Sequence, residues 1–229
     1  PASNFRRNYP NFSHGTAGVA YFLATLHQTT GDLVFLDAAL AGARYLDAVA
    51  TRTNGGTRIF HQSDGGEDRF YLSWCHGPVG TARLFHRLHQ ITGERRWGGW
   101  VDSLVAGVLA SGAPEQRTTG YWNNISQCCG NVGIGQFCVD LARYHPTSAA
   151  AALRVRVVED TIRRATDDAT GLRWIQAENR AEPENLVAQT GFMQGAAGVG
   201  TFLLQADAFD RGIDWPFPQP DTPFTKVPQ

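Results

Sequence analysis

The chain has few cysteines for its length and no long apolar run. Four cysteines in 229 residues are too few for a disulfide-stabilised scaffold, and two of them are adjacent, which suits a reducing compartment and metal or thiol chemistry. We therefore expect a cytoplasmic protein. No stretch approaches the ~20 apolar residues of a membrane-spanning helix, and no leader with a charged start and an apolar core is visible. The sequence predicts no association with a membrane.

The chain also lacks an excess of charge of either sign. A formal net charge of −1 gives no general attraction to nucleic acid or to an anionic membrane surface, so neither is an expected partner. Hydrophobic residues make up 42% and charged residues 18% of the chain. This composition is typical of a globular domain that is large enough to bury a core.

A short glycine-rich motif, which we call the cassette, occurs four times. In the first two copies, an apolar stripe of helical spacing follows the cassette and ends at a glycine 13 residues after the last cassette glycine, from Gly18 to Gly31 and from Gly80 to Gly93. This spacing indicates an internal repeat of cassette, inner helix, tight turn, outer helix and long loop. The four copies are His14-Gly15-Thr16-Ala17-Gly18, Cys75-His76-Gly77-Pro78-Val79-Gly80, Cys128-Cys129-Gly130-Asn131-Val132-Gly133 and Gln194-Gly195-Ala196-Ala197-Gly198.

The repeat predicts an all-α fold of helical hairpins over residues 1–212. The fourth copy has an inner helix but no outer helix, and residues 213–229 read as a proline-rich extended tail. The long loop over residues 52–73 is expected to hold a small β-hairpin around Asp64-Gly65-Gly66. The first inner helix is indicated by the spacing of Val19, Phe22, Leu23 and Leu26.

Three cysteines stand at the starts of predicted inner helices. Thiolates favour Zn²⁺ in tetrahedral geometry, and adjacent Cys128 and Cys129 can share a metal where the backbone turns, as Gly130 permits. Cys75 can join them only if the helix starts converge, which a closed ring of hairpins allows and a straight solenoid does not. The alternative is that the adjacent pair is buried and inert. Cys138 lies on an apolar helix stripe and reads as a core residue.

Histidines also occupy cassette positions. His14 is equivalent to His76, Cys129 and Gln194, and it could act as an acid or a base beside a metal site. We expect His76 and the preceding Trp74 to line the site and contact the substrate. Two histidines near the ends of inner helices, His27 and His89, read as structural.

Carboxylates in the loops that lead into the cassettes offer a competing function. A pair of them could act as in a glycosidase, since helical toroids host sugar chemistry. Solvated loop carboxylates are the simpler interpretation. The residues concerned are Asp64, Glu67, Glu178 and Glu184.

The combination of motifs resembles the lanthionine synthetase C-like (LanC) family. The residues that carry the resemblance are Ser13-His14-Gly15, Trp74-Cys75-His76-Gly77, Cys128-Cys129-Gly130 and Gly191-Phe192-Met193-Gln194-Gly195. The resemblance implies an α/α toroid, of which this chain would supply the C-terminal portion, about four of seven hairpins. It implies zinc held by Cys75, Cys128 and Cys129, in a three-cysteine variant with Cys129 in place of the family's histidine. It also implies proton transfer by His14.

The resemblance further implies zinc-dependent addition of a cysteine thiol to dehydroalanine or dehydrobutyrine, which forms a thioether. The expected partner is a dehydrated precursor peptide, or a thiol substrate such as glutathione. Two alternatives remain open beside this cyclase. One is transfer of glutathione or another small thiol to a dehydroamino acid, and the other is a non-catalytic, zinc-stabilised module that binds peptides.

Overall fold

The computed structural model describes residues 7–116, 121–122, 124–144, 148–178, 180–217, 219 and 221–224. These residues fall into two compact units. The first lies within Pro1–Ala110 and Thr118–Tyr121, and the second within Ser111–Arg117 and Trp122–Gln229. None of the helices in this described part of the chain has the length and apolar character needed to cross a bilayer.

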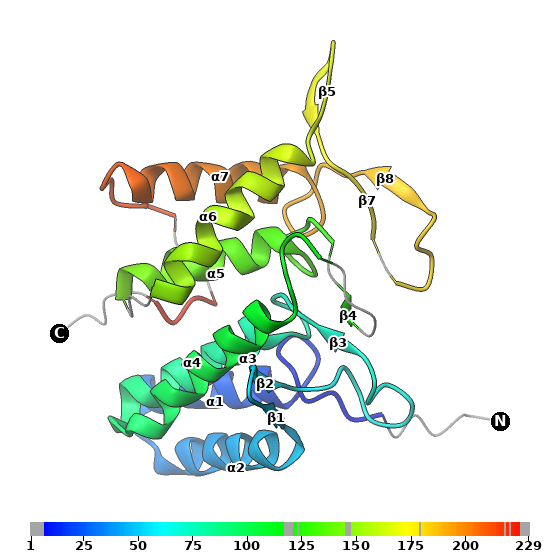
Figure 1. Ribbon diagram of the computed structural model, residues 1–229. Coiled ribbons are helices and arrows are strands. Elements are labelled where there is room, and N and C mark those ends of the chain that lie inside the picture. The colour runs from blue at the N-terminus through cyan, green and yellow to red at the C-terminus, as the bar shows by residue number, and fades with distance from the viewer. Residues whose placement is uncertain are drawn as a thin grey trace. The chain divides into compact units, whose positions relative to one another are not determined.

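The first unit consists of two helical hairpins (Figure 1). The inner helices, α1 and α3, pack against each other, and each also packs against the outer helix that follows it, α2 or α4. A small antiparallel hairpin, β1–β2, lies against α4. The elements are α1 (Thr16–Thr30), α2 (Leu33–Val49), β1 (Thr51–Thr53), β2 (Gly56–Arg58), β3 (Phe70–Tyr71), α3 (Pro78–Thr92) and α4 (Arg95–Ala110).

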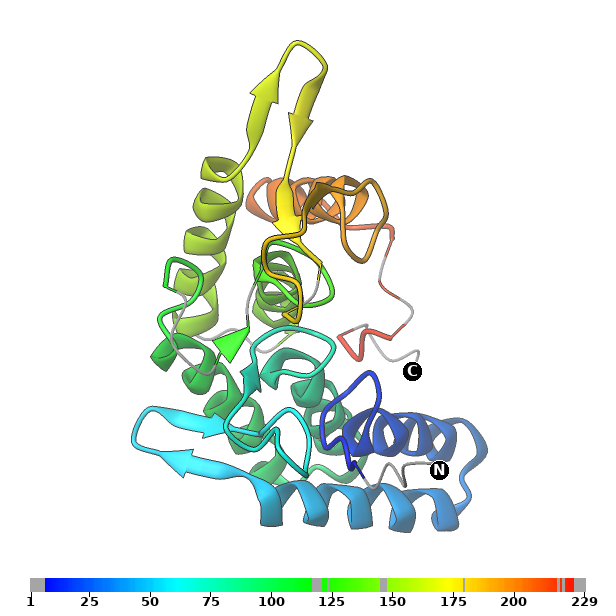
Figure 2. The same cartoon turned by 90° about the vertical axis from the view of Figure 1, so that its right-hand side faces the viewer.

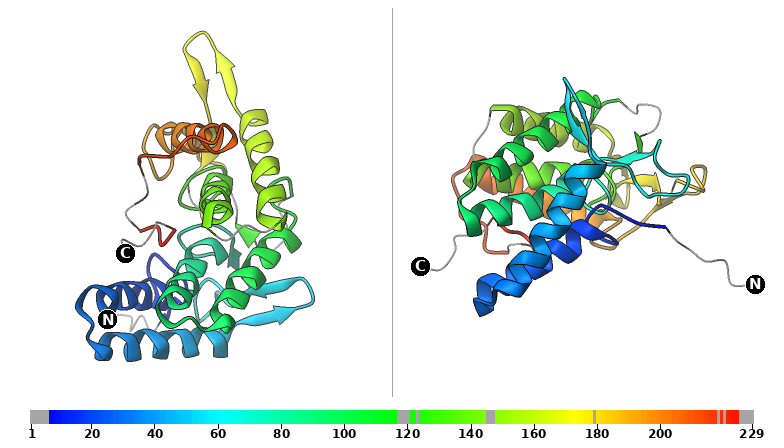
Figure 3. Two further views of the ribbon diagram at one scale, coloured as in Figure 1. Left: turned by 90° about the vertical axis from the view of Figure 1, so that its left-hand side faces the viewer. Right: turned by 90° about the horizontal axis from the view of Figure 1, so that it is seen from below.

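The second unit contains one hairpin, α5–α6, and the inner helix α7, which packs against α5. Two antiparallel β-hairpins, β5–β6 and β7–β8, lie in the connection between α6 and α7, and the first of them projects beyond the helices (Figures 2 and 3). The remaining elements are β4 (Tyr121–Trp122), α5 (Asn131–Tyr144), α6 (Ser148–Arg163), β5 (Thr166–Asp168), β6 (Gly171–Arg173), β7 (Ile175–Ala177), β8 (Leu186–Ala188) and α7 (Ala196–Asp210).

The described part of the proline-rich tail contains no helix or strand: residues 213–217, 219 and 221–224. Phe224 nevertheless is buried, and its ring contacts that of Phe137 on α5, with 5.6 Å between the ring centroids. The hydroxyl of Thr222 reaches the carboxylate of Asp140 on the same helix. Residues 218, 220 and 225–229 lie outside the described residues.

Three of the inner helices have the same backbone hydrogen bonds at their first residues, and this shared capping explains why the cassette recurs in the sequence. The first amides of a helix have no partner within the helix, and here carbonyls seven residues upstream accept from them. In the first copy Thr16 donates to Tyr9 (3.0 Å) and Ala17 to Pro10 (2.9 Å). The third and fourth copies repeat both bonds, with Asn131 to Asn124, Val132 to Ile125, Ala196 to Gln189 and Ala197 to Thr190.

The second copy replaces the first of these donors by proline. Pro78 is the first residue of α3, and proline has no N–H group to satisfy at this position. The substitution therefore removes a donor that the other three copies must cap.

Glycine is required where the upstream loop passes the helix start. A Cβ on Gly195 would lie 2.2 Å from the carbonyl oxygen of Gln189, and a Cβ on Gly198 would lie 1.9 Å from that of Phe192. Both distances are far below van der Waals contact, so no other residue fits without moving the backbone. The other copies show the same approach, at 2.0 Å for Gly15, 2.1 Å for Gly18, 1.9 Å for Gly80 and 2.3 Å for Gly130.

The tight turns of the first two hairpins are also copies of each other. Gly31 and Gly93 end α1 and α3 in the left-handed region, with φ of 74° and 69°, as glycine at a helix C-terminus does. His27 Nδ1 lies 2.9 Å from the Asp32 carbonyl oxygen, and His89 Nδ1 lies 3.0 Å from that of Glu94. Each histidine bridges its own turn, so the structural interpretation of both is confirmed.

The apolar stripe predicts α1 correctly, but it is not the buried side of the helix. The buried side of α1 is formed by Ala17, Ala20, Tyr21 and Ala24, whereas Val19 and Phe22 are 61% and 62% exposed. Small residues face the neighbouring helices because α1 and α2 approach closely: a Cβ on Gly42 would lie 2.8 Å from the Cβ of Ala20. An apolar stripe identifies a helix but does not say which side its neighbours cover.

The hairpin near the loop over residues 52–73 lies earlier in the sequence than expected. Its turn is Asn54-Gly55, between β1 and β2, where Thr53 pairs with Gly56. Around Asp64-Gly65-Gly66 the structure has only an isolated bridge between Gln62 and Gly66. Asn-Gly is the stronger signal for a two-residue hairpin turn.

Two glycines of α7 test this account of the cassette. We expect Gly198→Ala to lower the free energy of unfolding by about 2–3 kcal/mol, because its Cβ collides with the Phe192 carbonyl. Gly200→Ala should raise it by up to about 1 kcal/mol, because nothing lies within 4 Å of its Cβ and alanine favours the helix. Denaturant unfolding followed by circular dichroism measures both. Equal effects of the two substitutions would contradict the steric requirement.

Candidate functional site

The second unit presents two adjacent thiols at the start of α5. The Sγ atoms of Cys128 and Cys129 are 3.4 Å apart. Cys129 is buried, and Cys128 is partly exposed. Tetrahedral zinc with Zn–S bonds of ~2.3 Å needs sulfur atoms roughly 3.7 Å apart, so this pair fits two corners of such a site with little adjustment.

Buried polar side chains hold the backbone of the two cysteines. Asn124 Oδ1 accepts from both the amide (3.0 Å) and the hydroxyl (2.8 Å) of Ser126. The Ser126 hydroxyl oxygen accepts from the amide of Cys129 at 3.1 Å. Asn124 and Ser126 are 2% and 0% exposed, so a short buried chain of hydrogen bonds fixes the turn that carries the thiols.

A second set of bonds joins this turn to the fourth cassette. The amide of Cys128 donates to the carbonyl of Met193 at 2.9 Å. The buried side chain of Gln176, on β7, accepts from the amide of Ile125 at 2.9 Å and donates to the carbonyl of Gln194. The β7–β8 hairpin thereby fastens cassettes three and four together.

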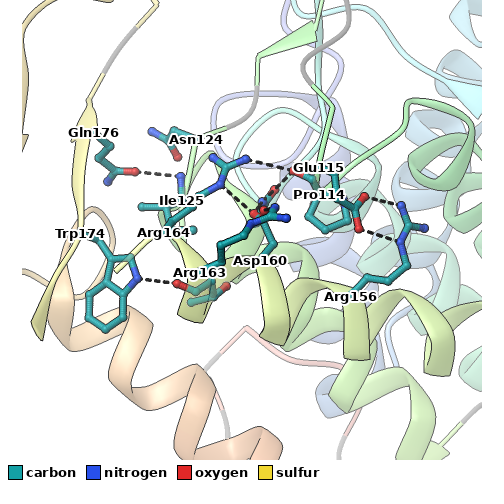
Figure 4. A network of polar contacts seen from close by, with 12 residues as sticks. Pro114, Glu115, Asn124, Ile125, Arg156, Asp160, Arg163, Arg164, Trp174 and Gln176 are labelled. Carbon is teal, nitrogen blue, oxygen red and sulfur yellow. Dashed lines mark hydrogen bonds and ion pairs between the residues drawn. The ribbon is translucent and has the colours of Figure 1, made fainter. Parts of the chain in front are cut away.

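A network of polar contacts around the buried carboxylate of Asp160 (Figure 4) also supports the start of α5. Asn131, directly after the cysteine turn, donates to Asp160 Oδ2 (2.6 Å) and to the Pro114 carbonyl (3.2 Å). Asp160 has a side chain only 1% exposed and pairs with Arg163 and Arg164. A buried carboxylate is stable only when partners replace its hydration, and here two guanidinium groups and an amide do so.

In the first unit, the second cassette carries Cys75. Its side chain is 3% exposed, and its carbonyl accepts from the amide of Ser13 at 2.7 Å. Ser13 and Cys75 occupy equivalent cassette positions, as do Cys128 and Met193. The same backbone bond thus joins the two cassettes within each unit.

Next to Cys75 in the sequence, His76 belongs to a group of five rings in the first unit. His14 Nδ1 lies 2.9 Å from His76 Nε2 and 2.9 Å from the Ser13 hydroxyl oxygen. The imidazole of His61 meets that of His76 edge-on, with 4.5 Å between centroids, and stacks on Tyr71 at 4.5 Å. Tyr9 contacts His14, His61 and His76. We call these five residues the ring cluster.

Burial sets the protonation state of the central histidine. His76 is 6% exposed; burial first, then the neighbouring His61 and His14, lower its pKa to about 3. His76 is therefore neutral near pH 7. One nitrogen of a neutral imidazole carries hydrogen and the other accepts, so His76 can share a hydrogen with His14 without adding charge.

The N-terminal arm and the loop before β3 position the ring cluster. The amide of Ser63 donates to the carbonyl of Asn8 at 2.9 Å, and the amide of Asn8 donates to the Ser63 hydroxyl at 2.9 Å. Buried Asn11 donates to the Phe60 carbonyl at 2.8 Å and accepts from Thr81 of α3 at 3.0 Å. These bonds hold the loop in the position at which the ring of His61 contacts that of His76.

The sequence analysis identified His14 and His76 but missed the rest of the ring cluster. Tyr9, His61 and Tyr71 lie outside every cassette, in the arm and in the long loop. The available signal was the density of aromatic residues and histidine in that loop, from Phe60 to Tyr71.

Trp74 contacts Phe12, which precedes the first cassette. Its ring meets that of Phe12 edge-on, with 5.6 Å between centroids. Trp74 and Phe12 line a cavity of about 550 Å³ together with His14. Trp74 therefore lies beside the same cavity as His14.

The remaining candidates have structural partners. Cys138 is 0% exposed, as expected of a core residue, and burial raises its pKa to about 12. Glu67 accepts from the amides of Asp64, Gly65 and Gly66, and backbone hydrogen bonds, its own first, lower its pKa. Glu178 accepts from Gln189 at 2.8 Å.

Helical hairpins that repeat with their inner helices packed together are typical of the α/α-toroid class of all-α proteins. The chain belongs to the lanthionine synthetase C-like protein family, whose model matches residues 2–217. A search of curated protein sequences finds no match to this chain.

Solved structures support the fold. Nisin cyclase aligns with a TM-score of 0.63 at 16% identity, over 90% of this chain and 48% of its own. The α-1,6-mannanase GH76A of Salegentibacter sp. HEL1_6 aligns with a TM-score of 0.53 at 15% identity, over 88% and 59%. The chain thus spans about half the length of nisin cyclase.

The burial of the thiols leads to a prediction about their reactivity. With a pKa of about 12, Cys138 keeps its proton until the pH approaches that value, so only about one molecule in 10⁴ is thiolate at pH 8. In metal-stripped, folded protein we expect iodoacetamide to modify partly exposed Cys128 and to spare Cys138, as measured by peptide mass spectrometry. In denaturant both should react. Equal labelling in the folded protein would contradict the burial of Cys138.

Proposed function

We propose that this chain carries the site of a lanthionine-type cyclase, which adds a cysteine thiol to dehydroalanine or dehydrobutyrine in a peptide. Family membership supports this class of reaction. The observation that carries the proposal is the adjacent pair of thiols, Cys128 and Cys129, with sulfur atoms 3.4 Å apart at the start of α5. Such a pair suits a soft metal.

Cys75 completes the proposed ligand set. Cys75 occupies the cassette position of Cys128, and we propose it as the third thiolate beside Cys128 and Cys129. Three thiolate donors fit zinc and leave its fourth tetrahedral position for a substrate. Bound zinc would keep a substrate thiol deprotonated near neutral pH. No disulfide involves any of the four cysteines, in keeping with a cytoplasmic protein.

His14 is the proposed acid. The substrate thiolate forms a C–S bond to the β-carbon of the dehydroamino acid, the C=C π bond breaks, and its electrons move onto the carbonyl as an enolate. His14 then gives a proton to the α-carbon. His14 is exposed, which lets it reach substrate. Its Nδ1 stays at hydrogen-bonding distance from His76 and Ser13, so Nε2 is the nitrogen that faces the reaction.

His76 and Trp74 are the proposed substrate-contact residues. His76 stays neutral and holds His14, while Trp74 walls the cavity of about 550 Å³ beside it. The expected partner is a dehydrated precursor peptide, and glutathione is the alternative thiol. The mannanase resemblance brings no glycosidase proposal, because it shows the fold alone and Glu67 and Glu178 already accept hydrogen bonds.

Zinc content tests the ligand set without requiring activity. We expect about one zinc per chain, lost largely from Cys75→Ala, Cys128→Ala and Cys129→Ala and retained by Cys138→Ala, which removes a thiol from the core. Metal analysis of purified protein measures it. Full zinc in Cys75→Ala, or equal loss from Cys138→Ala, would overturn the assignment.

The role of His14 is tested by kinetics. In the complete protein, His14→Asn should slow thioether formation about 10²–10⁴-fold, the usual contribution of a positioned acid, with zinc content unchanged. His27→Asn is the matched control, because that histidine only bridges a turn, and it should react at the normal rate. Loss of zinc from His14→Asn would make His14 a ligand instead.

The choice of thiol separates the cyclase from its alternatives. A peptide that carries both dehydroalanine and cysteine should lose its free thiol and gain a ring, without change of mass. Consumption of glutathione without ring formation would favour the small-thiol transferase. Binding of zinc and peptide without reaction of either thiol would favour the peptide-binding module.

A further inference from the structure

In the first unit, the backbone bond between the two cassettes brings the next two side chains together. The amide of Ser13 donates to the carbonyl of Cys75 at 2.7 Å. The residues that follow are His14 and His76, and Nδ1 of the first lies 2.9 Å from Nε2 of the second. Two cassettes joined in this way therefore present neighbouring side chains just before their glycines.

The second unit joins its two cassettes by the same bond. The amide of Cys128 donates to the carbonyl of Met193 at 2.9 Å. The residues that follow are Cys129 and Gln194. Gln194 thus has, relative to the thiol turn, the position that the second histidine of the first unit has relative to the first.

The backbone at Gln194 is fixed. Gly195, which follows it, has φ of −138° and ψ of −162°, close to the −142° and −168° of Gly15 in the first cassette. The carbonyl of Gln194 also accepts from the side chain of Gln176, which is only 5% exposed. The side chain of Gln194 therefore starts from a defined position at the thiol turn.

The side-chain oxygen of Gln194 has no donor. Its Oε1 atom is buried, and none of the described residues donates a hydrogen bond to it. Most buried polar groups in proteins have a partner, because an unpaired group loses its bonds to water without replacement. The residue as a whole is partly exposed, so a ligand can supply the missing donor.

We propose that Gln194 binds the backbone of the substrate's cysteine, with Oε1 accepting from the amide N–H of that cysteine. This inference rests on the proposed function, which brings the substrate thiol to Cys128 and Cys129. The amide nitrogen of a cysteine lies close to its sulfur along the chain, so a thiol held at the turn carries its own N–H group to Gln194. Gln194 is then a substrate-binding residue that favours cysteine within a peptide over a simple thiol.

A neutral amide suits this contact beside metal donors. A primary amide offers one acceptor and two donors and carries no charge. A carboxylate in the same place would add negative charge next to Cys128 and Cys129, and a histidine would compete for the metal. The group that Gln194 recognises is common to a cysteine-containing peptide and to glutathione, because the cysteine of each has an amide N–H.

The test removes the hydrogen bond from each side in turn. Gln194→Met keeps the length of the side chain and removes the amide, and Gln194→Ala guards against a steric effect of methionine. Gln189→Met is the matched control, because Gln189 lies in the loop before the same helix and its amide donates to Glu178 at 2.8 Å. The ligands are two fluorescein-labelled peptides with one cysteine and no dehydroamino acid. In one of them the backbone nitrogen of the cysteine is methylated.

For the native protein and Gln189→Met, we expect the unmodified peptide to bind about 3–10-fold more tightly than the methylated one, the usual contribution of one hydrogen bond. In Gln194→Met and Gln194→Ala the two peptides should bind equally. Zinc content should be unchanged in all variants, because Gln194 is not a proposed ligand. Fluorescence anisotropy with the complete protein measures this binding without any reaction.

Equal binding of the two peptides by the native protein would overturn the inference, and an ordered water would then be the partner of Oε1. Tighter binding of the unmodified peptide that persists in both Gln194 variants would overturn it as well. Displacement of the labelled peptide by glutathione as strongly as by unlabelled peptide would keep the contact and assign it to the small thiol.

The outcomes also separate this inference from the proposed function. Loss of the preference in both Gln194 variants, without any thioether formed on a dehydroalanine peptide by the native protein, would keep the contact and overturn the cyclase. Normal thioether formation by a native protein that binds both labelled peptides equally would keep the cyclase and overturn the contact.

Discussion

The close passage of loop backbone across the first turn of each inner helix is the constraint on which the rest of the structure depends. In three of the four copies it satisfies helix amides that would otherwise lack partners, and in the first, second and fourth copies it admits only glycine at two positions three residues apart. The residue just before the first glycine is thereby held at the helix start in every copy. That residue is His14, His76, Cys129 or Gln194, so chemistry is placed by the same backbone contact that builds the fold.

The two units support their functional groups by different means. In the second unit, hydrogen bonds and a buried ionic network fix the cysteine turn, with Asn124, Ser126 and Asp160 almost wholly buried. Removal of one partner from such a network costs more than the network contributes, because the remaining polar groups stay buried. In the first unit, stacked rings and the neutral imidazole of His76 support His14. One set of contacts fixes the proposed metal donors, and the other keeps the proposed acid accessible.

The fold by itself does not decide the reaction. A mannanase and nisin cyclase both share the helical-hairpin architecture at low identity with this chain, and architecture of this kind hosts unrelated activities. The chemistry depends instead on the side chain at each cassette of this chain. Two cassettes of this chain carry thiols, and two carry histidines. A sugar hydrolase needs a pair of carboxylates, which in this chain would have to come from the loops. Here those loop carboxylates accept hydrogen bonds or lie exposed.

The sequence by itself determined the helices, the tight turns, the cassettes and the thiol and histidine candidates, because periodicity, glycine and proline act within a few residues. His27 and His89, read as structural from their repeat position, also needed only local information. Tertiary structure alone decided the rest. The buried side of α1 depends on which helices pack against it, and His61 reaches His76 only because Asn8 and Asn11 hold the loop. Asn131 and Asp160 are 29 residues apart in the sequence and form a hydrogen bond. A local sequence pattern cannot predict such a contact, because it forms only when two separate segments have folded against each other.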